Sequence, residues 1–92
     1  MDVVKVEILD NDVVWRDLEG EIVILNLATG YYYGLEGAAN EMWRLLVEHG
    51  STEKVCDIMS REYDASADRL RADLEAFVDD LARRDIVRIA AP

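Results

Sequence analysis

The sequence predicts an α+β fold of the winged helix-turn-helix kind, with an N-terminal three-stranded antiparallel sheet followed by three helices. Two observations support this class. The first third of the chain places apolar and β-branched residues in short runs between turn-forming residues, which is typical of antiparallel strands. The remaining two thirds repeat apolar residues at helical spacing. A chain of 92 residues has the length of one domain, so we expect residues 1–92 to form a single unit.

The predicted strands follow one another from the N-terminus. Residues 4–8 alternate apolar with charged side chains, which is the period of a half-buried strand. Residues 13–16 form the next expected strand of the meander. Residues 22–27 are almost entirely apolar, so we expect this strand to lie at the centre of its sheet or to be buried on both faces. A hairpin loop over residues 28–30 then leads into the last strand, residues 31–33.

Three amphipathic segments follow the strands. The first covers residues 37–48 and ends before a glycine, and the second begins at Ser51 or Thr52, both of which can cap a helix. The third begins at Ser66, with an acidic residue in its first turn and arginines in its last, as the helix dipole favours. Its apolar face consists of Leu70, Leu74, Phe77, Val78 and Leu81. Residues 86–89 close the chain as a short strand or an extended tail.

The charge balance argues against several classes of partner. The chain has 20 acidic and 10 basic residues, a net charge of −10 and a pI near 4.3. Such a surplus disfavours nucleic acid, which is bound through lysine and arginine, and it also disfavours anionic lipid surfaces. The third helix, where a DNA-recognition helix would lie, mixes acidic residues with its arginines. No apolar run is long enough to span a membrane and the N-terminus has no signal-peptide pattern, so we expect a cytoplasmic protein.

The side chains of an enzyme or of a metal centre are largely missing. His49 is the only histidine and Cys56 the only cysteine, which excludes an internal disulfide and a clustered metal site. We interpret His49 as a surface or capping residue at a helix end and Cys56 as a small buried side chain. Asp79 and Asp80 are neighbours on a helix and therefore diverge. There is also no glycine-rich phosphate loop, so we predict a protein that is not an enzyme and has no cofactor.

The three consecutive tyrosines are the most informative feature left. On a strand, Tyr31 and Tyr33 point to one face and Tyr32 to the other. One interpretation is that the inward rings complete the core. The other is that this strand forms the edge of the sheet, across a groove from the third helix, where an extended peptide could add itself as another strand. The residues alone do not decide between the two.

Several short segments, taken in order, carry a resemblance to a known family. They are Gly30 to Leu35, Trp43 to Leu46, Ser51 with Thr52, Tyr63 with Asp64, and the helix with Leu74, Phe77 and Leu81 that ends in Asp85, Ile86 and Val87. Together these segments resemble the PqqD-like family, whose members are stand-alone recognition elements for ribosomally made and modified peptides. The resemblance extends from about Val13 to Ile89. It departs from the family pattern at Glu36, where the family often has asparagine.

The resemblance implies a non-catalytic adaptor. Such a protein binds the leader segment of a precursor peptide as an added strand and delivers it to a modifying enzyme. The implied peptide-binding residues are Tyr31, Tyr32, Tyr33 and Gly34 on the strand, with Arg69, Asp73, Leu74 and Phe77 as candidates for the wall formed by the third helix. Leu74 and Phe77 are explained equally well as core residues.

The partner enzyme is expected to be a lasso-peptide leader protease. The alternative within the same class is a radical-SAM maturase, including the one of pyrroloquinoline quinone biosynthesis. An acidic adaptor suits a basic enzyme or a leader with cationic flanks. A different class of function, suggested by topology alone, is a winged-helix regulator that binds DNA or dimerises. An edge strand also permits a homodimer.

Overall fold

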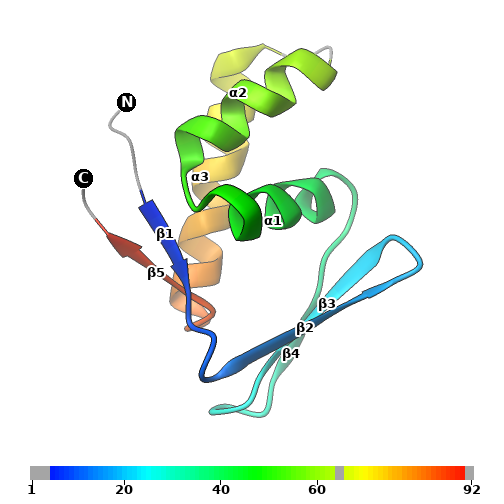
Figure 1. Cartoon of the computed structure of the whole chain (residues 1–92), viewed down its shortest axis with the longest axis vertical. Coiled ribbons are helices and arrows are strands. Elements are labelled where there is room, and N and C mark those ends of the chain that lie inside the picture. Colours follow the sequence, from blue (N-terminus) through cyan, green and yellow to red (C-terminus); the bar gives the residue numbers. More distant parts are fainter. Residues whose placement is uncertain (1–4, 64–65, 91–92) are drawn as a thin grey trace.

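The computed structural model describes residues 5–63 and 66–90. Its elements in chain order are β1 (Lys5–Ile8), β2 (Val13–Leu18), β3 (Glu21–Asn26), β4 (Tyr32–Gly34), α1 (Ala38–His49), α2 (Thr52–Glu62), α3 (Ala67–Arg83) and β5 (Val87–Ala90) (Figure 1). This order confirms the α+β class, with an antiparallel three-stranded sheet ahead of three helices. Val4, expected in the first strand, and Asp64, part of the family resemblance, lie outside the described residues.

The strands form two separate antiparallel sheets. One has the order β2-β3-β4, and the other pairs β1 with β5. The expectation of a meander that starts with the first strand is therefore wrong, because residues 5–8 leave it and pair with residues 87–90 at the opposite end of the sequence. An alternating pattern identifies a strand but carries no information about its partner. Figure 1 shows β1 and β5 side by side, apart from the long β2–β3 hairpin.

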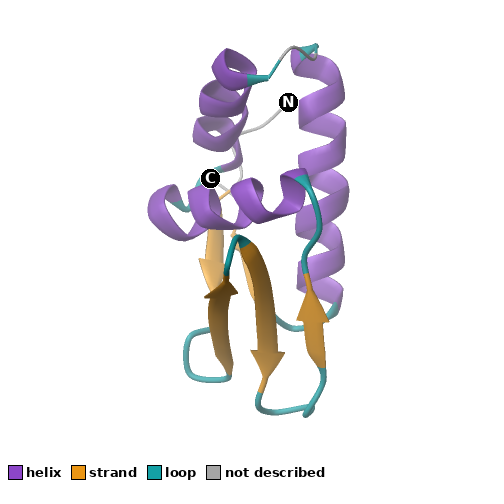
Figure 2. Ribbon diagram, turned by 90° about the vertical axis from the view of Figure 1, so that its right-hand side faces the viewer, coloured by secondary structure: helices purple, strands orange, loops and turns teal. Residues whose placement is uncertain are grey.

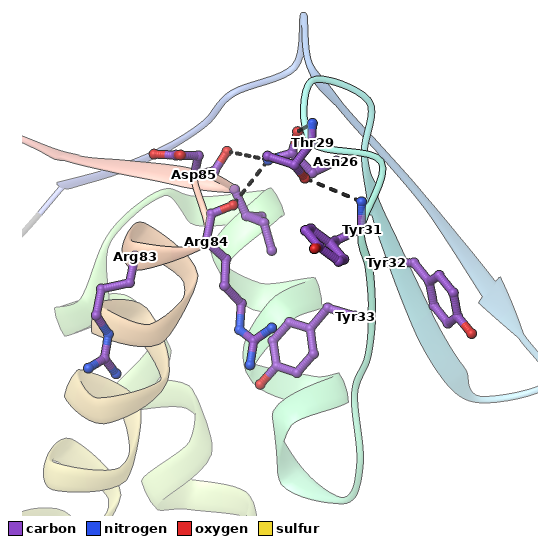
Figure 3. Close-up of a pocket in the computed structure, with 9 residues that line it drawn as sticks. Asn26, Thr29, Tyr31, Tyr32, Tyr33, Arg83, Arg84 and Asp85 are labelled. Atoms are coloured by element: carbon purple, nitrogen blue, oxygen red, sulfur yellow. Dashed lines mark hydrogen bonds between the residues drawn. The ribbon is translucent and has the colours of Figure 1, made fainter.

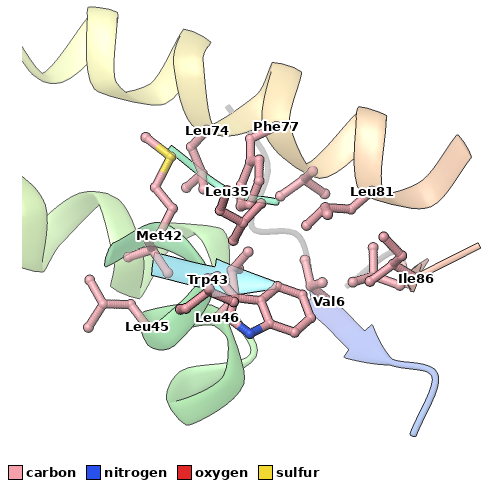
Figure 4. Packing of buried hydrophobic residues seen from close by; sticks show 14 of the residues in the cluster. Val6, Leu35, Met42, Trp43, Leu45, Leu46, Leu74, Phe77, Leu81 and Ile86 are labelled. Atoms are coloured by element: carbon pink, nitrogen blue, oxygen red, sulfur yellow. The ribbon is translucent and has the colours of Figure 1, made fainter. Parts of the chain in front are cut away.

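The central position of β3 is confirmed. Ile22 and Ile24 are fully buried on the inner face of the sheet, whereas Val23 and Leu25 on the other face are half-buried. The strand is thus completely covered on one face only. Figure 4 shows the core beyond this inner face, where side chains from α1 and α3 converge. Its buried residues include Val6, Leu35, Met42, Trp43, Leu45, Leu46, Leu74, Phe77, Leu81 and Ile86.

The expected helix boundaries are explained by local caps. The Ser51 hydroxyl accepts a hydrogen bond from the Lys54 N–H at the start of α2. The Ser66 hydroxyl accepts one from the Arg69 N–H, at 3.2 Å, at the start of α3. Each bond satisfies one of the donors that the first helical turn leaves unpaired. The two caps fix the starts of α2 and α3. The 17 residues of α3 then lead the chain back to the three-stranded sheet (Figure 2).

Candidate functional site

The strand β4 has an open edge. Within the described part of the chain, β4 is paired with β3 alone. The Tyr31 carbonyl and the Leu35 N–H, on either side of the strand, both bond to β3, at 2.9 and 2.8 Å. Backbone groups alternate in direction along an antiparallel strand, so the odd-numbered residues face β3. Tyr32 and Gly34 therefore direct their N–H and C=O groups toward the open edge.

The three tyrosine side chains have different surroundings. Tyr33 lies opposite Ile24 on the inner face of the sheet, and its ring is half-buried against the core. Tyr32 points to the outer face and is 76% exposed, and Tyr31 is 79% exposed. Figure 3 shows the Tyr33 ring directed toward the end of α3, and the Tyr32 ring on the opposite side of the strand. Of the three tyrosines only Tyr33 contributes to the core, and β4 is an edge strand of its sheet. The addition of a peptide strand at this edge stays a prediction.

A groove of about 200 Å³ lies between β4 and the C-terminal end of α3. One wall is the tyrosine strand with the hairpin loop before it. The other wall is the last turn of α3 and the turn that leads into β5 (Figure 3). The lining residues are Asn26, Thr29, Tyr31, Tyr32, Tyr33, Arg83, Arg84, Asp85 and Ile86. An extended peptide placed along the edge of β4 would have this groove beside it.

The side chains of Tyr33, Arg84 and Asp80 interact across the groove. The guanidinium of Arg84 lies 4.2 Å from the centre of the Tyr33 ring, a cation–π contact, and its Nε donates to the Asp80 carboxylate at 3.1 Å. The pKa of Tyr33 is raised above its ordinary value, first because the phenol is partly buried and then because it donates a hydrogen bond to Asp80. The folded chain therefore holds the phenol proton of Tyr33 more tightly than an exposed tyrosine would.

The residues predicted on α3 lie away from this groove. Arg69 and Asp73 are exposed on the N-terminal half of the helix, whereas Leu74 and Phe77 are buried in the core (Figure 4). None of the four lines the groove, whose helical wall is the last turn of α3. The strand residues Tyr31, Tyr32 and Tyr33 do line it, and Gly34 supplies part of the open edge. A role for the four helix residues in peptide binding stays a prediction.

Sequence reasoning missed Arg83, Arg84 and Asn26 as groove residues. In the sequence, the two arginines bear on the helix dipole and on DNA binding, and neither property indicates which strand lies opposite them. The side chain of Asn26 bonds to the carbonyls of Arg84 and Asp85, which lie 58 and 59 residues further along the chain. Helical periodicity identifies the buried face of α3, but which turn of the helix meets β4 is decided by tertiary packing. No local pattern carries that information.

Other kinds of site find no support in the described residues. Within residues 5–63 and 66–90, no three His, Cys, Asp or Glu side chains are grouped so that they could hold a metal ion. Cys56 is half-buried, and burial raises the pKa of its thiol, which is the environment of a packing residue rather than of a nucleophile. No helix in this part of the chain is long and apolar enough to cross a membrane.

Comparisons with known proteins agree with the geometry. The family model for coenzyme PQQ synthesis protein D (PqqD) matches residues 21–87. Two similar solved structures are "TbiB1 in Complex with the TbiA(beta) Leader Peptide" and "Lasso peptide synthetase B1 complexed with the leader peptide". The first is 31% identical with a TM-score of 0.86, covering 94% of this chain and 99% of that one. The second is 18% identical with a TM-score of 0.82, covering 91% and 98%. No curated protein sequence matches.

Proposed function

This chain belongs to the PqqD family, and from that premise we propose that it is a non-catalytic adaptor that binds the leader segment of a ribosomally made precursor peptide as an added β-strand. One observation carries the proposal, namely the open edge of β4 beside a groove. A peptide strand bonded to Tyr32 and Gly34 would extend the three-stranded sheet by one strand. The two similar solved structures are each complexes with a leader peptide.

The groove adds selectivity to a backbone interaction that is otherwise independent of sequence. Main-chain hydrogen bonds at an edge are available to any extended peptide, so side-chain contacts have to select the leader. On the inner side, a bound strand would place alternate side chains near Tyr33 and the end of α3. On the outer side it would place the remaining ones near Tyr32. Tyrosine suits both positions because it offers a large apolar surface with a polar tip.

For the enzyme that receives the peptide, we propose a lasso-peptide leader protease. The name of one similar structure, a lasso peptide synthetase B1, supports this partner. A radical-SAM maturase is the alternative that the family name supports, through coenzyme PQQ synthesis. Co-purification of the chain with each class of enzyme, in the presence of leader peptide, distinguishes the two.

A pair of variants at Tyr32 tests strand addition. Tyr32→Pro removes the outward N–H but leaves the bonds to β3, which involve the odd-numbered residues, and proline is tolerated at this kind of edge position. Tyr32→Ala removes the same ring and keeps the N–H. We expect Tyr32→Pro to bind the leader at least about tenfold more weakly than Tyr32→Ala, because a main-chain hydrogen bond and close approach of the peptide strand are both lost.

The measurement is calorimetric titration with two kinds of synthetic peptide, the TbiA(beta) leader and the leader of any precursor peptide that neighbouring genes encode. Circular dichroism checks that both variants keep the fold. Equal affinities of the proline and alanine variants would contradict strand addition at β4. Absence of saturable binding by the unmodified chain would contradict the adaptor function itself.

A further inference from the structure

A buried asparagine joins the two walls of the groove. Asn26 is the last residue of β3 and is only 3% exposed. Its side-chain NH₂ group donates to the carbonyls of Arg84 and Asp85, at 3.0 and 3.2 Å. Its side-chain oxygen accepts from the N–H groups of Ala28 and Thr29, at 2.9 and 3.3 Å. One side chain thus uses both donors and both acceptor sites of its amide, and it connects the hairpin loop to the end of α3 (Figure 3).

The groove wall that Asn26 contacts is the C-terminal end of α3, where the backbone takes a left-handed conformation at Asp85. Asp85 follows α3 with a φ of 57°, and the Ile86 N–H bonds back to the Leu81 carbonyl at 3.0 Å. This geometry is that of a Schellman motif, in which glycine is the usual residue at the left-handed position. Carbonyls at a helix C-terminus have no partner within the helix. Asn26 provides one for Arg84 and one for Asp85, so the turn and the strand are fixed relative to each other.

We propose that Asn26 is a positioning residue that fixes the separation of the groove walls and thereby the affinity for the added peptide strand. The inference rests on the proposed function, because it assigns a role within the same site. Two further contacts cross the groove, one from the Tyr33 ring to the Arg84 guanidinium and one from the Tyr33 phenol to the Asp80 carboxylate. Both depend on partly exposed side chains, 49% for Arg84 and 30% for Asp80, which have room to change rotamer. The buried amide has no such freedom, since all of its hydrogen-bonding groups are used.

The test is Asn26→Asp, which keeps the shape of the side chain and its two acceptor bonds to the loop. It replaces the donor by a second oxygen that faces two carbonyl oxygens, so the link to α3 is lost. The matched control is Asn40→Asp in α1, whose side chain bonds to the opposite end of β3. Asn40 is 8% exposed, accepts from the Ile22 N–H at 2.8 Å and donates to the Gly37 carbonyl at 3.2 Å, but it does not line the groove.

We expect both variants to lose stability and only Asn26→Asp to lose affinity for the leader peptide, by about tenfold or more when the measurement is corrected for the folded fraction. The probe is the TbiA(beta) leader, together with the leader of any precursor peptide that neighbouring genes encode. Affinity of Asn26→Asp within about twofold of the unmodified chain overturns the proposal, as does an equal loss in both variants.

A second measurement needs no peptide and separates this proposal from the function on which it rests. The Tyr33 ring lies 4.2 Å from the Arg84 guanidinium, so it shifts the nearby side-chain proton resonances of Arg84 in NMR spectra. We expect that ring-current shift to collapse in Asn26→Asp and to persist in Asn40→Asp. If the ring-current shift of Arg84 persists in both variants, Asn26 does not fix the separation of the groove walls. A chain that binds no leader contradicts the proposed function, whereas the ring-current shift still decides whether Asn26 fixes the walls.

Discussion

Tyr33 makes the groove sensitive to alkaline pH. Burial and the hydrogen bond to Asp80 raise its pKa above the ordinary value of 10.0, so the folded chain holds this proton more tightly than the unfolded chain does. The resulting stabilisation is fully present below 10.0 and is lost as the pH rises through the raised pKa. We therefore expect the free energy of unfolding to fall across this range, and to fall less steeply in Tyr33→Phe, which has no phenol proton.

Urea unfolding at several pH values between about 9 and 11 measures this effect. Tyr31→Phe is the matched control, because its side chain is 79% exposed and makes no contact with the core. The same slope in Tyr33→Phe as in the unmodified chain would show that the phenol of Tyr33 is not responsible.

At the same scale, the residues show what sequence could and could not predict about the site. Residue alternation correctly placed Tyr32 on one face of the strand and Tyr33 on the other, because that geometry is local. Helical spacing correctly identified Leu74 and Phe77 as members of the apolar face of α3, and the structure buries both. The tie between Asn26 and the far end of α3 depends on how distant segments pack, and no local pattern encodes it.

Among the elements, the turn between α3 and β5 links stability to function. Asp85 adopts a left-handed conformation that costs a residue with a branched Cβ more than it costs aspartate or glycine. We expect Asp85→Val to lower the free energy of unfolding by roughly 1–2 kcal/mol, and Asp85→Gly to stay within about 1 kcal/mol of the unmodified chain. Asp85 is exposed, so these differences come from the backbone rather than from packing.

Glu19 provides the control for this prediction. It has the same φ of 57°, but it lies in the turn between β2 and β3, outside the groove. Urea unfolding and leader titration of Glu19→Val and Asp85→Val should show similar losses of stability, with weaker leader binding in Asp85→Val alone. If both variants bind the leader equally well, the conformation of the α3–β5 turn does not affect the groove.

The two sheets differ in how far their sequences predict them. The three-stranded sheet consists of β2, β3 and β4, which follow one another in the chain. Its strand order can therefore be predicted from turn residues and strand patterns. The pairing of β1 with β5 joins residues such as Glu7 and Arg88, which are 81 positions apart. Sequence could therefore predict that residues 5–8 form a strand, but it could not predict their partner. A contact of that separation is decided by the packing of the whole chain.

At the scale of the whole molecule, the net charge of −10 is large for 92 residues, yet two arginines line the groove. The contact of Arg84 with Asp80 offsets part of that local positive charge. We therefore expect the molecule as a whole to attract cationic segments, and the groove to bind a peptide mainly through backbone and aromatic groups. Because the overall charge and the groove contacts have different roles, we predict that charge controls the rate at which the peptide associates more than the lifetime of the complex.

Two synthetic leaders with the same strand-forming segment test this prediction, one flanked by lysines and the other by glutamines. We expect the lysine-flanked leader to associate faster at low ionic strength, with a dissociation rate close to that of its counterpart. The difference in association rate should disappear when added salt shortens the Debye length to about 3 Å, near 1 M. Stopped-flow fluorescence measures both rates, with a fluorophore attached to each leader peptide. Equal association rates at low salt would show that the acidic surface does not steer the peptide, and leader selection would then rest on the groove alone.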